Sequence, residues 1–252
     1  MSMIVILQPS YLPWLGYFEQ ISRCDVFVYL DDVQYTKNDW RNRNRIKKKD
    51  GAQWLTVPVS FQFGQKINET CIDKSKPWQK KHLQALKTWY GKSKFFPAYF
   101  EELQSILHEN WSYLVDLDVA LTQWVMEKLR LQPKIIFSSQ LSIRSSDSQL
   151  RLIEICKNMN RTFFYEGKSG QDYIDTELFK NNGIHIAFQD YKHPYYNQLW
   201  IKEQGFISHL SIIDLLFNHG PESLAILTGK KIIQGQENIT VRHADEVKPA
   251  SK

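Results

Sequence analysis

The sequence has few cysteines and no long apolar segment. Its 252 residues include three scattered cysteines, Cys24, Cys71 and Cys156. An odd, dispersed set excludes a disulfide framework and the closely spaced ligands of a structural zinc site, so we expect free thiols. No segment approaches the roughly 18 consecutive apolar residues of a membrane-spanning helix, and the start MSMIVILQPS lacks the basic region of a secretory signal. We therefore expect a cytoplasmic protein without a transmembrane segment.

Several motifs of common enzyme classes are also missing. The chain has no G-x-x-x-x-G-K-[ST] loop, no G-x-G-x-x-G turn, no G-x-S-x-G elbow and no H-E-x-x-H helix. Simple NTPase, dehydrogenase, serine hydrolase and zinc protease functions therefore have no support. The seven histidines are dispersed, with no pair at metal-ligand spacing, so we predict no metal site. No segment resembles a nucleic-acid-binding motif, and duplex nucleic acid is not an expected partner.

The composition that is present is typical of a folded α/β protein. Hydrophobic residues make up 42% and charged residues 23% of the chain. The run MIVIL predicts a strand, WLGYFEQIS a helix and VFVYL a second strand within about thirty residues, the length of a βαβ unit. Because the strands of such a unit end at one edge of the sheet, residues 8–13 should lie beside Asp31, Asp32 and Gln34.

Later segments repeat this alternation. The sequence predicts strands at residues 134–141, 162–167 and 184–191, with helices at 147–160 and 170–182. Residues 77–130 are expected to form a helical insertion. After residue 230 the periodicity ends, so we predict a flexible tail over residues 231–252. We therefore expect a single α/β domain over residues 1–230 with a parallel-sheet core of βα units.

The stretch QPSYLPWLGYF, after the first predicted strand, is unusually rich in proline and aromatic residues for a short loop. Its prolines restrict the backbone, its glycine permits close approach, and the following helix start offers free N–H groups to an anion or a carbonyl. We predict that this loop forms the floor of a ligand site. The candidate contacts are Gln8, Tyr11, Trp14 and Gly16. Tyr17 and Phe18 are expected to pack the helix on the sheet.

Two adjacent carboxylates, Asp31 and Asp32, follow the second apolar strand. They have the chemistry to hold Mg²⁺, to bind sugar hydroxyls or to serve as a base. A turn with a capping pair explains them equally well. We take Asp31, Asp32 and Lys37 as candidate catalytic residues and Gln34 as a candidate substrate contact.

A basic stretch follows, with seven basic residues between Lys37 and Lys49. In an extended chain the period of two places Arg41, Arg43 and Arg45 on one face. The rigid guanidinium fork suits phosphate, so this face, with Trp40 beside it, is predicted to grip a diphosphate or a phosphorylated carrier. The alternative is a solvated edge strand whose charges oppose aggregation.

The segment HLSIIDLLFNHGPE predicts a short helix near the end of the domain. Ser211 and Asp214 have the spacing of a capping box. In such a box the side chain of Ser211 caps the helix, and the side chain of Asp214 accepts a hydrogen bond from the backbone N–H of Ser211. A capped helix start also attracts anions, and His209 stands next to it. Ser211 and Asp214 are therefore further candidate substrate contacts.

These motifs together resemble one family. The stretches QPSYLPWLGYF, DVFVYLDDVQYTKNDWRNRNRIK, WLTVPV and LSIIDLLFNHG are similar to the successive motifs of the WbqC-like proteins, which are bacterial proteins often encoded with genes for surface polysaccharide and O-antigen biosynthesis. The resemblance runs from about residue 4 to residue 220. It implies a role in the synthesis of lipopolysaccharide or another surface polysaccharide and names no reaction.

A looser similarity concerns layout. A strand, a proline-containing loop and a helix, with a distal Ser-x-x-[TD] helix, are similar to the arrangement in nucleotidylyltransferases and related amide ligases, which hold ATP with an H-x-G-H element. The corresponding residues of this chain are 14–17, WLGY, which contain neither histidine of the H-x-G-H element.

From these resemblances we predict a transferase that moves an acyl or aminoacyl group to the amine of a nucleotide-linked or lipid-linked amino sugar. The donor is not identified, and ATP and Mg²⁺ are candidate cofactors. One alternative is a nucleotidylyltransferase that activates a sugar phosphate. Another is a non-catalytic protein that binds a glycan precursor or has a regulatory role.

Overall fold

The core of the protein is a five-stranded parallel sheet. The computed structural model describes residues 2–231, 233 and 241–243. The strands lie in the order β7-β2-β1-β8-β9, and every neighbouring pair is parallel. Their bounds are β1 (Met3–Leu7), β2 (Val26–Tyr29), β7 (Lys134–Phe137), β8 (Phe163–Glu166) and β9 (His185–Phe188). With helices on both sides, this arrangement confirms the predicted α/β class.

The central strand β1 is apolar on both faces, as expected for a strand covered by helices on both sides. Ile4 and Ile6 enter a core shared with the two helices α5 (Ser148–Asn158) and α6 (Thr176–Asn181). Val5, between them, enters the larger core on the other face. Successive side chains of one strand therefore fill two separate layers.

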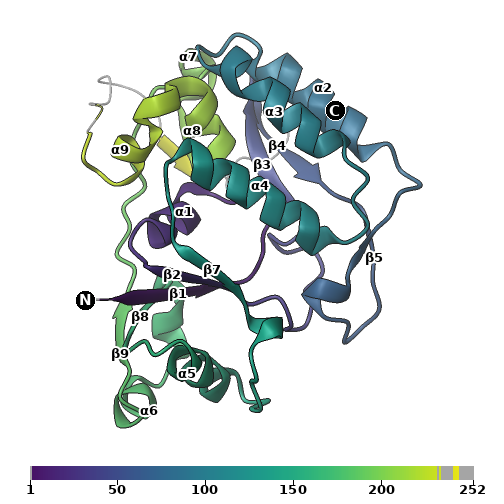
Figure 1. Cartoon of the computed structure of the whole chain (residues 1–252). Helices are drawn as coiled ribbons and strands as arrows, with labels where there is room; N and C mark the ends of the chain where they lie inside the picture. Colours follow the sequence, from purple (N-terminus) through teal and green to yellow (C-terminus); the bar gives the residue numbers. More distant parts are fainter. Residues whose placement is uncertain (1, 232, 234–240, 244–252) are drawn as a thin grey trace.

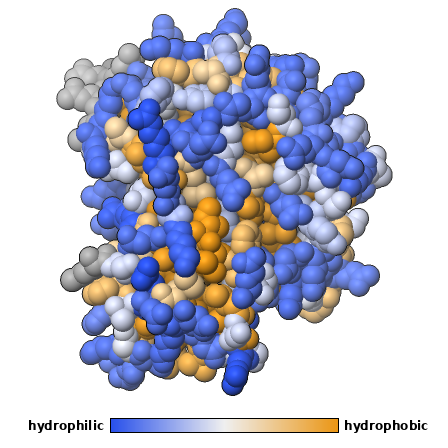
Figure 2. All heavy atoms as spheres, viewed as in Figure 1, coloured by the Kyte–Doolittle hydropathy of each residue, from blue (hydrophilic) through white to orange (hydrophobic). Residues whose placement is uncertain are grey.

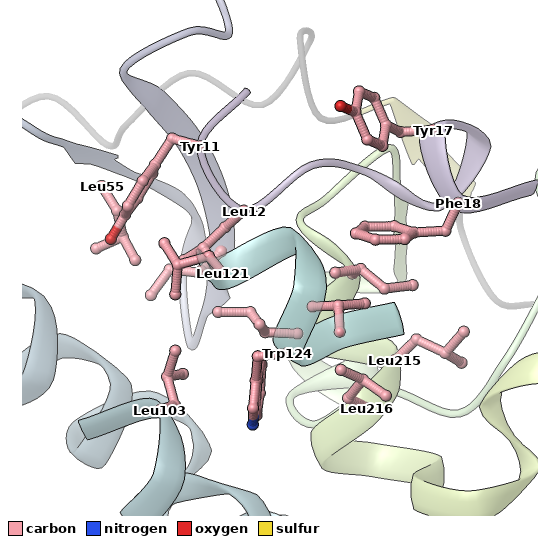
Figure 3. Close-up of a cluster of buried hydrophobic side chains, with 14 of the residues drawn as sticks. Tyr11, Leu12, Tyr17, Phe18, Leu55, Leu103, Leu121, Trp124, Leu215 and Leu216 are labelled. Atoms are coloured by element: carbon pink, nitrogen blue, oxygen red, sulfur yellow. The ribbon is translucent and has the colours of Figure 1, made fainter. Parts of the chain in front are cut away.

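The larger core lies under most of the remaining helices (Figure 1). These are α1 (Leu15–Ile21), α2 (Trp78–Tyr90), α3 (Phe96–His108), α4 (Leu114–Lys128), α8 (Ile212–His219) and α9 (Ser223–Leu227). Figure 3 shows Trp124 of α4 in this core with Leu216 of α8 on one side and Leu103 of α3 on the other, while Leu121 of α4 lies beside Leu12. The fully buried Phe18 packs α1 as predicted. The segment predicted as a helical insertion contains α2, α3 and α4.

Smaller sheets flank this core. The hairpin of β3 (Arg43–Lys48) and β4 (Gly51–Thr56) is antiparallel, as is the pair β5 (Val59–Ser60) and β6 (Cys71–Ile72). The segment QWLTVPVS is divided between β4 and β5. The short helix α7 (Ile201–Gln204) precedes β10 (Phe206–Ser208).

The last described strand, β11 (Val241–His243), pairs in parallel with β10. These three residues of the predicted tail are therefore part of a small sheet. Residues 232, 234–240 and 244–252 of that tail lie outside the part of the chain that the structure describes.

The surface of the molecule is largely polar, and its cysteines are free. Figure 2 shows a largely polar face with an apolar strip near β7. Within the described ranges, no helix is both long and apolar enough to cross a membrane. All three cysteines are unpaired, as predicted.

Candidate active site at the switch point of the sheet

The strand order places a crevice between β1 and β8. From β1 the chain proceeds to β2 and β7 on one side of the sheet, whereas β8 and β9 lie on the other side. Ligands of open α/β sheets bind outside the carboxyl ends of the strands at such a switch point. A cavity of about 650 Å³ lies at this place and includes Gln8, after β1, together with Glu166 and Gly167, at the end of β8. Its volume is in the range of small-molecule sites.

Glu166 is the acidic residue of the cavity lining. Its residue surface is 9% exposed, and burial raises the pKa of its carboxyl group to about 7. The Oε1 atom accepts a hydrogen bond of 2.9 Å from the backbone N–H of Gly167. A Cβ atom at Gly170 would lie 2.4 Å from Cγ of Glu166, so the glycine there makes room for this side chain. Glu166 can therefore gain and lose a proton near neutral pH inside the cavity.

Gln8 places an amide opposite this carboxyl group, on the β1 side of the cavity. Its side-chain Oε1 is buried and has no hydrogen-bond partner among the residues that the structure describes. Its backbone carbonyl accepts a hydrogen bond from the hydroxyl group of Tyr17 at 3.3 Å. Because a buried amide oxygen without a donor is costly, a ligand donor at this position would stabilise the site. The predicted contact at Gln8 thus lies in the cavity.

Arg41 supplies a guanidinium group to the same cavity. Its Nη1 donates to Oγ of Ser10 at 3.2 Å, and its Nη2 lies 3.4 Å from a carboxylate oxygen of Asp39. Burial lowers the pKa of Arg41, while the charge of Asp39 acts in the opposite direction. An anionic ligand would offset the same cost of burial. Lys168, after β8, adds a second cation to the lining.

A buried carboxyl group, Asp118 on α4, interacts electrostatically with Arg41. Its residue is fully buried, and neither carboxylate oxygen has a hydrogen-bond partner among the described residues. Burial raises the pKa of Asp118 well above its usual range, and the charge of Arg41 opposes this effect. The positive charge of Arg41 thus favours the ionised form of Asp118.

Aromatic rings form another wall. The ring of Trp14 is stacked on that of His209, with 4.9 Å between centroids, and meets the edge of Tyr191 at 5.8 Å. A Cβ atom at Gly16 would lie 2.2 Å from the Trp14 ring. Gly16 therefore acts through Trp14, because only a residue without a side chain lets this ring lie against the first turn of α1. Tyr17, predicted to pack only, also lines the cavity.

Three histidines that are far apart in the sequence meet beside Trp14. The rings of His209 and His243 lie 4.0 Å apart, and those of His193 and His209 lie 4.9 Å apart. His209 has a φ of 57°, a left-handed conformation that is uncommon outside glycine. Burial lowers the pKa of His193 to about 3, so this ring is neutral at physiological pH. Within the described ranges, no group of three or more His, Cys, Asp or Glu residues is arranged to hold a metal ion.

The predicted catalytic pair Asp31 and Asp32 lies outside this lining. Asp31 accepts hydrogen bonds from the backbone N–H and the Oγ of Ser139, at 2.9 and 2.6 Å. Asp32 forms an ion pair with Arg151 and accepts a hydrogen bond from Ser138. Although burial acts against it, the hydrogen bonds from Arg151 and Ser138 lower the pKa of Asp32. These contacts join the end of β2 to the turn after β7, and a catalytic role for the pair stays a prediction.

Three further predicted residues also lie outside the cavity lining. Tyr11 is fully buried, and its hydroxyl group lies 2.8 Å from Nδ1 of His82. Gln34 and Lys37 are exposed, and the ammonium group of Lys37 lies 5.8 Å from the centre of the Phe61 ring. Tyr11 therefore supports the loop from beneath, while the roles predicted for the other two remain predictions.

The three arginines of the basic stretch divide between two places. Strand β3 begins at Arg43, so the period of two holds for Arg43 and Arg45. Their guanidinium carbons lie 4.4 and 4.6 Å from the Trp54 ring of the neighbouring strand. Arg41 precedes the strand and enters the cavity instead, as does Trp40. The two groups are thus adjacent without sharing one face.

The capping-box interpretation is correct for Ser211 and wrong for Asp214. The Oγ of Ser211 accepts from the backbone N–H of Ile213 at 3.5 Å. The buried carboxylate of Asp214 accepts instead from the hydroxyl group of Tyr90 at 2.7 Å and from the amide of Gln198 at 2.9 Å. Asp214 turns inward because these two buried donors need an acceptor. Neither Ser211 nor Asp214 is part of the cavity lining, so their predicted substrate contact stays a prediction.

Several cavity residues were not predicted from the sequence. They are Glu166, Lys168, Gln189, Tyr191 and His243. Glu166 had a usable signal, since it is an acid directly at the end of a predicted parallel strand. The others come from loops and from β11, whose positions depend on tertiary packing.

The sequence is similar to a known protein family. The model of the WbqC-like protein family matches residues 8–226. An uncharacterized protein, Rv1507c of Mycobacterium tuberculosis, is 37% identical over 227 residues, which cover 88% of this chain and 96% of that protein. No solved structure matches the chain.

Proposed function

The chain belongs to the WbqC-like protein family, and from the chemistry of its cavity we propose that it transfers an acyl or aminoacyl group to the amine of a nucleotide-linked or lipid-linked amino sugar in surface polysaccharide biosynthesis. The observation that carries this proposal is Glu166, a carboxyl group with a pKa of about 7 in a cavity at the switch point of the sheet. A sugar amine is mostly protonated at neutral pH. Its transfer chemistry therefore needs a proton acceptor at the position of the nitrogen atom.

In the proposed reaction the carboxylate of Glu166 takes one proton from the ammonium group and releases it to solvent, which leaves a neutral amine and a free carboxylate. The amine nitrogen attacks the carbonyl carbon of an activated acyl donor, and a C–N bond forms. The bond between this carbon and the leaving group of the donor breaks, with its electron pair going to the leaving group. The nitrogen loses its second proton to the carboxylate of Glu166, which passes that proton to the leaving group or to solvent.

The other cavity residues suit an anionic sugar derivative. Arg41 offers a guanidinium group for phosphate, and Gln8 offers a buried amide oxygen to which no described residue donates a hydrogen bond. Trp14 presents an aromatic ring to the cavity, and such rings pack on the apolar faces of sugars. The residues thus support acceptor binding by charge at one end and by a flat ring at the other.

The proposal is tested by deleting the gene in its host and comparing the mass of the surface polysaccharide repeat with that of the parent. We expect an otherwise complete repeat that has lost one small acyl or aminoacyl mass. Loss of the whole polymer would favour activation of a sugar phosphate instead, and an unchanged repeat would contradict the proposal.

A second arm of the experiment assigns the effect to the cavity. Complementation with Glu166→Gln should leave the acyl mass missing, whereas complementation with Glu177→Gln should restore it. Glu177 is a matched control because it lies on α6 with its side chain 70% exposed. Restoration by Glu166→Gln would contradict the role of Glu166 as the base.

A further inference from the structure

Beside the cavity, Trp40 and the hairpin β3–β4 bring together two partly exposed tryptophans, the half-buried Arg43 and the buried Arg45. Trp40 and Trp54 are 37% and 39% exposed, although tryptophan is usually well buried. Their ring centroids lie 5.5 Å apart. The guanidinium carbon of Arg43 lies 4.4 Å from the centre of the Trp54 ring. That of Arg45 lies 4.6 Å from the centre of the Trp54 ring and 5.3 Å from the centre of the Trp40 ring. We call these four residues the Trp–Arg platform.

The platform is continuous with the cavity. Trp40 belongs to both, and Arg41, the next residue, enters the cavity from the same side. Asn44, on β3 between Arg43 and Arg45, lines the cavity from the opposite face of the strand, so the platform meets the cavity at Trp40. A ligand that reaches out of the cavity past Arg41 therefore meets Trp40 first and Trp54 next.

We propose that the Trp–Arg platform is a nucleobase subsite, so that the acceptor sugar is carried by a nucleoside diphosphate, with the base on Trp40 and Trp54 and the diphosphate between Arg41 and Arg43. This inference rests on the proposed function for the sugar and decides between the two carriers left open there.

The chemistry of the platform separates these carriers. A nucleoside diphosphate combines a double negative charge with a flat π-system, and tryptophan faces and guanidinium planes both stack on bases. Arginine beside the rings supplies charge to the diphosphate and to the π-face. An isoprenoid diphosphate has the same charged group but a flexible apolar chain, which needs an extended apolar groove and gains nothing specific from charged neighbours.

The experiment measures the affinity of the whole chain, by titration calorimetry without any acyl donor, for UDP, GDP, inorganic diphosphate and farnesyl diphosphate. We expect UDP and GDP to bind at least about tenfold more tightly than inorganic diphosphate, the effect typical of one stacked base. Trp54→Ala should remove this difference, and Trp54→Phe should keep most of it. Phe63→Ala is the matched control, because Phe63 is an aromatic residue that is 97% exposed and lies outside the platform.

Two outcomes would overturn the inference. Equal affinities for the nucleotides and for inorganic diphosphate would exclude a base subsite. Tight binding of farnesyl diphosphate that Trp54→Ala leaves unchanged would assign the carrier to a lipid. Nucleotide binding that is retained by a chain without transfer activity would reject the proposed reaction while keeping the subsite, so the two failures are distinguishable.

Discussion

Two strand ends at the carboxyl edge of the sheet each carry acidic residues, and they differ in the hydrogen bonds that those acids accept. At the end of β2, the carboxylates of Asp31 and Asp32 accept hydrogen bonds from Ser138 and Ser139, and Asp32 also pairs with Arg151. At the end of β8, Glu166 lines the cavity and, among the described residues, accepts a hydrogen bond from the backbone N–H of Gly167.

The consequence is a difference in proton affinity. The contacts of Asp32 lower its pKa, whereas burial raises that of Glu166 to about 7. An acid that is fully hydrogen-bonded in its charged form holds structure together, and an acid that lacks such partners is ready for proton transfer. Asp32 and Glu166 both follow or end a parallel strand, so this position does not by itself identify a catalytic acid.

The largest expected effect concerns the activity of Glu166→Gln. An amide cannot accept the proton, so we expect kcat/KM of acyl transfer to fall at least about 100-fold. The proposed reaction requires the carboxylate form of Glu166, so kcat/KM of the parent chain should rise with pH through about 7. The pH profile of the purified enzyme checks this. A profile that is flat between pH 5 and 9 would remove Glu166 from the proton transfer.

The next effect concerns stability. Because the folded pKa of Glu166 is raised above its unfolded value of about 4.3, its contribution to stability is lost as pH rises from about 4 to about 7. Glu166→Gln removes this charge and should be more stable than the parent at pH 8, on the order of 2 kcal/mol, with no gain at pH 4. Urea denaturation at both pH values measures the difference. A variant that is less stable at pH 8 would contradict the assigned burial of a charge.

At the end of β2, removing a carboxylate should lower the stability instead of raising it. Asp32→Asn removes a charge that Arg151 and Ser138 bind, so we expect a loss of about 1–2 kcal/mol of unfolding free energy at pH 7 with activity of the folded enzyme within about threefold of the parent. Since the folded pKa of Asp32 is lowered, the parent should lose this advantage as pH falls below about 4. A loss of activity without a loss of stability would contradict this structural role and support the catalytic role predicted for Asp32.

The smallest effect tests how Glu166 is placed. Gly170→Ala would put a Cβ atom 2.4 Å from Cγ of Glu166 and so move the carboxyl group. We expect kcat to fall about tenfold with little change in KM, because a misplaced base slows the chemical step more than it weakens substrate binding. Steady-state kinetics separate the two constants. A change in KM alone would indicate that Gly170 shapes the substrate pocket instead.

Much of the fold was predictable because its signals are local. The apolar runs of β1 and β2 and the helix pattern between them identify the βαβ unit within a short stretch of sequence. The later strands and helices follow the same logic, and the order of the sheet makes the carboxyl edge the natural place for a ligand. Gln8, Trp14, Trp40 and Arg41 were predicted from the sequence as binding residues, and all four line the cavity.

The rest depended on contacts between distant segments. Tyr11 has a polar end that suits a ligand, but His82 on α2 holds its hydroxyl group inside the core. Asp214 has capping-box spacing, but two buried donors from Tyr90 and Gln198 compete for its carboxylate. Spacing in the sequence does not contain this information, since both outcomes depend on which buried donor lies nearby.

The aromatic wall of the cavity is built from residues that are synthesised at different times. Trp14 is made early in synthesis. Its neighbour His209 lies against His243, which belongs to β11 and is made much later. A nascent chain can form the sheet and bury Glu166 while this wall is still unfinished. A recombinant chain stopped at residue 230, where the periodic pattern ends, would be expected to fold its sheet but to bind its substrate through an incomplete wall.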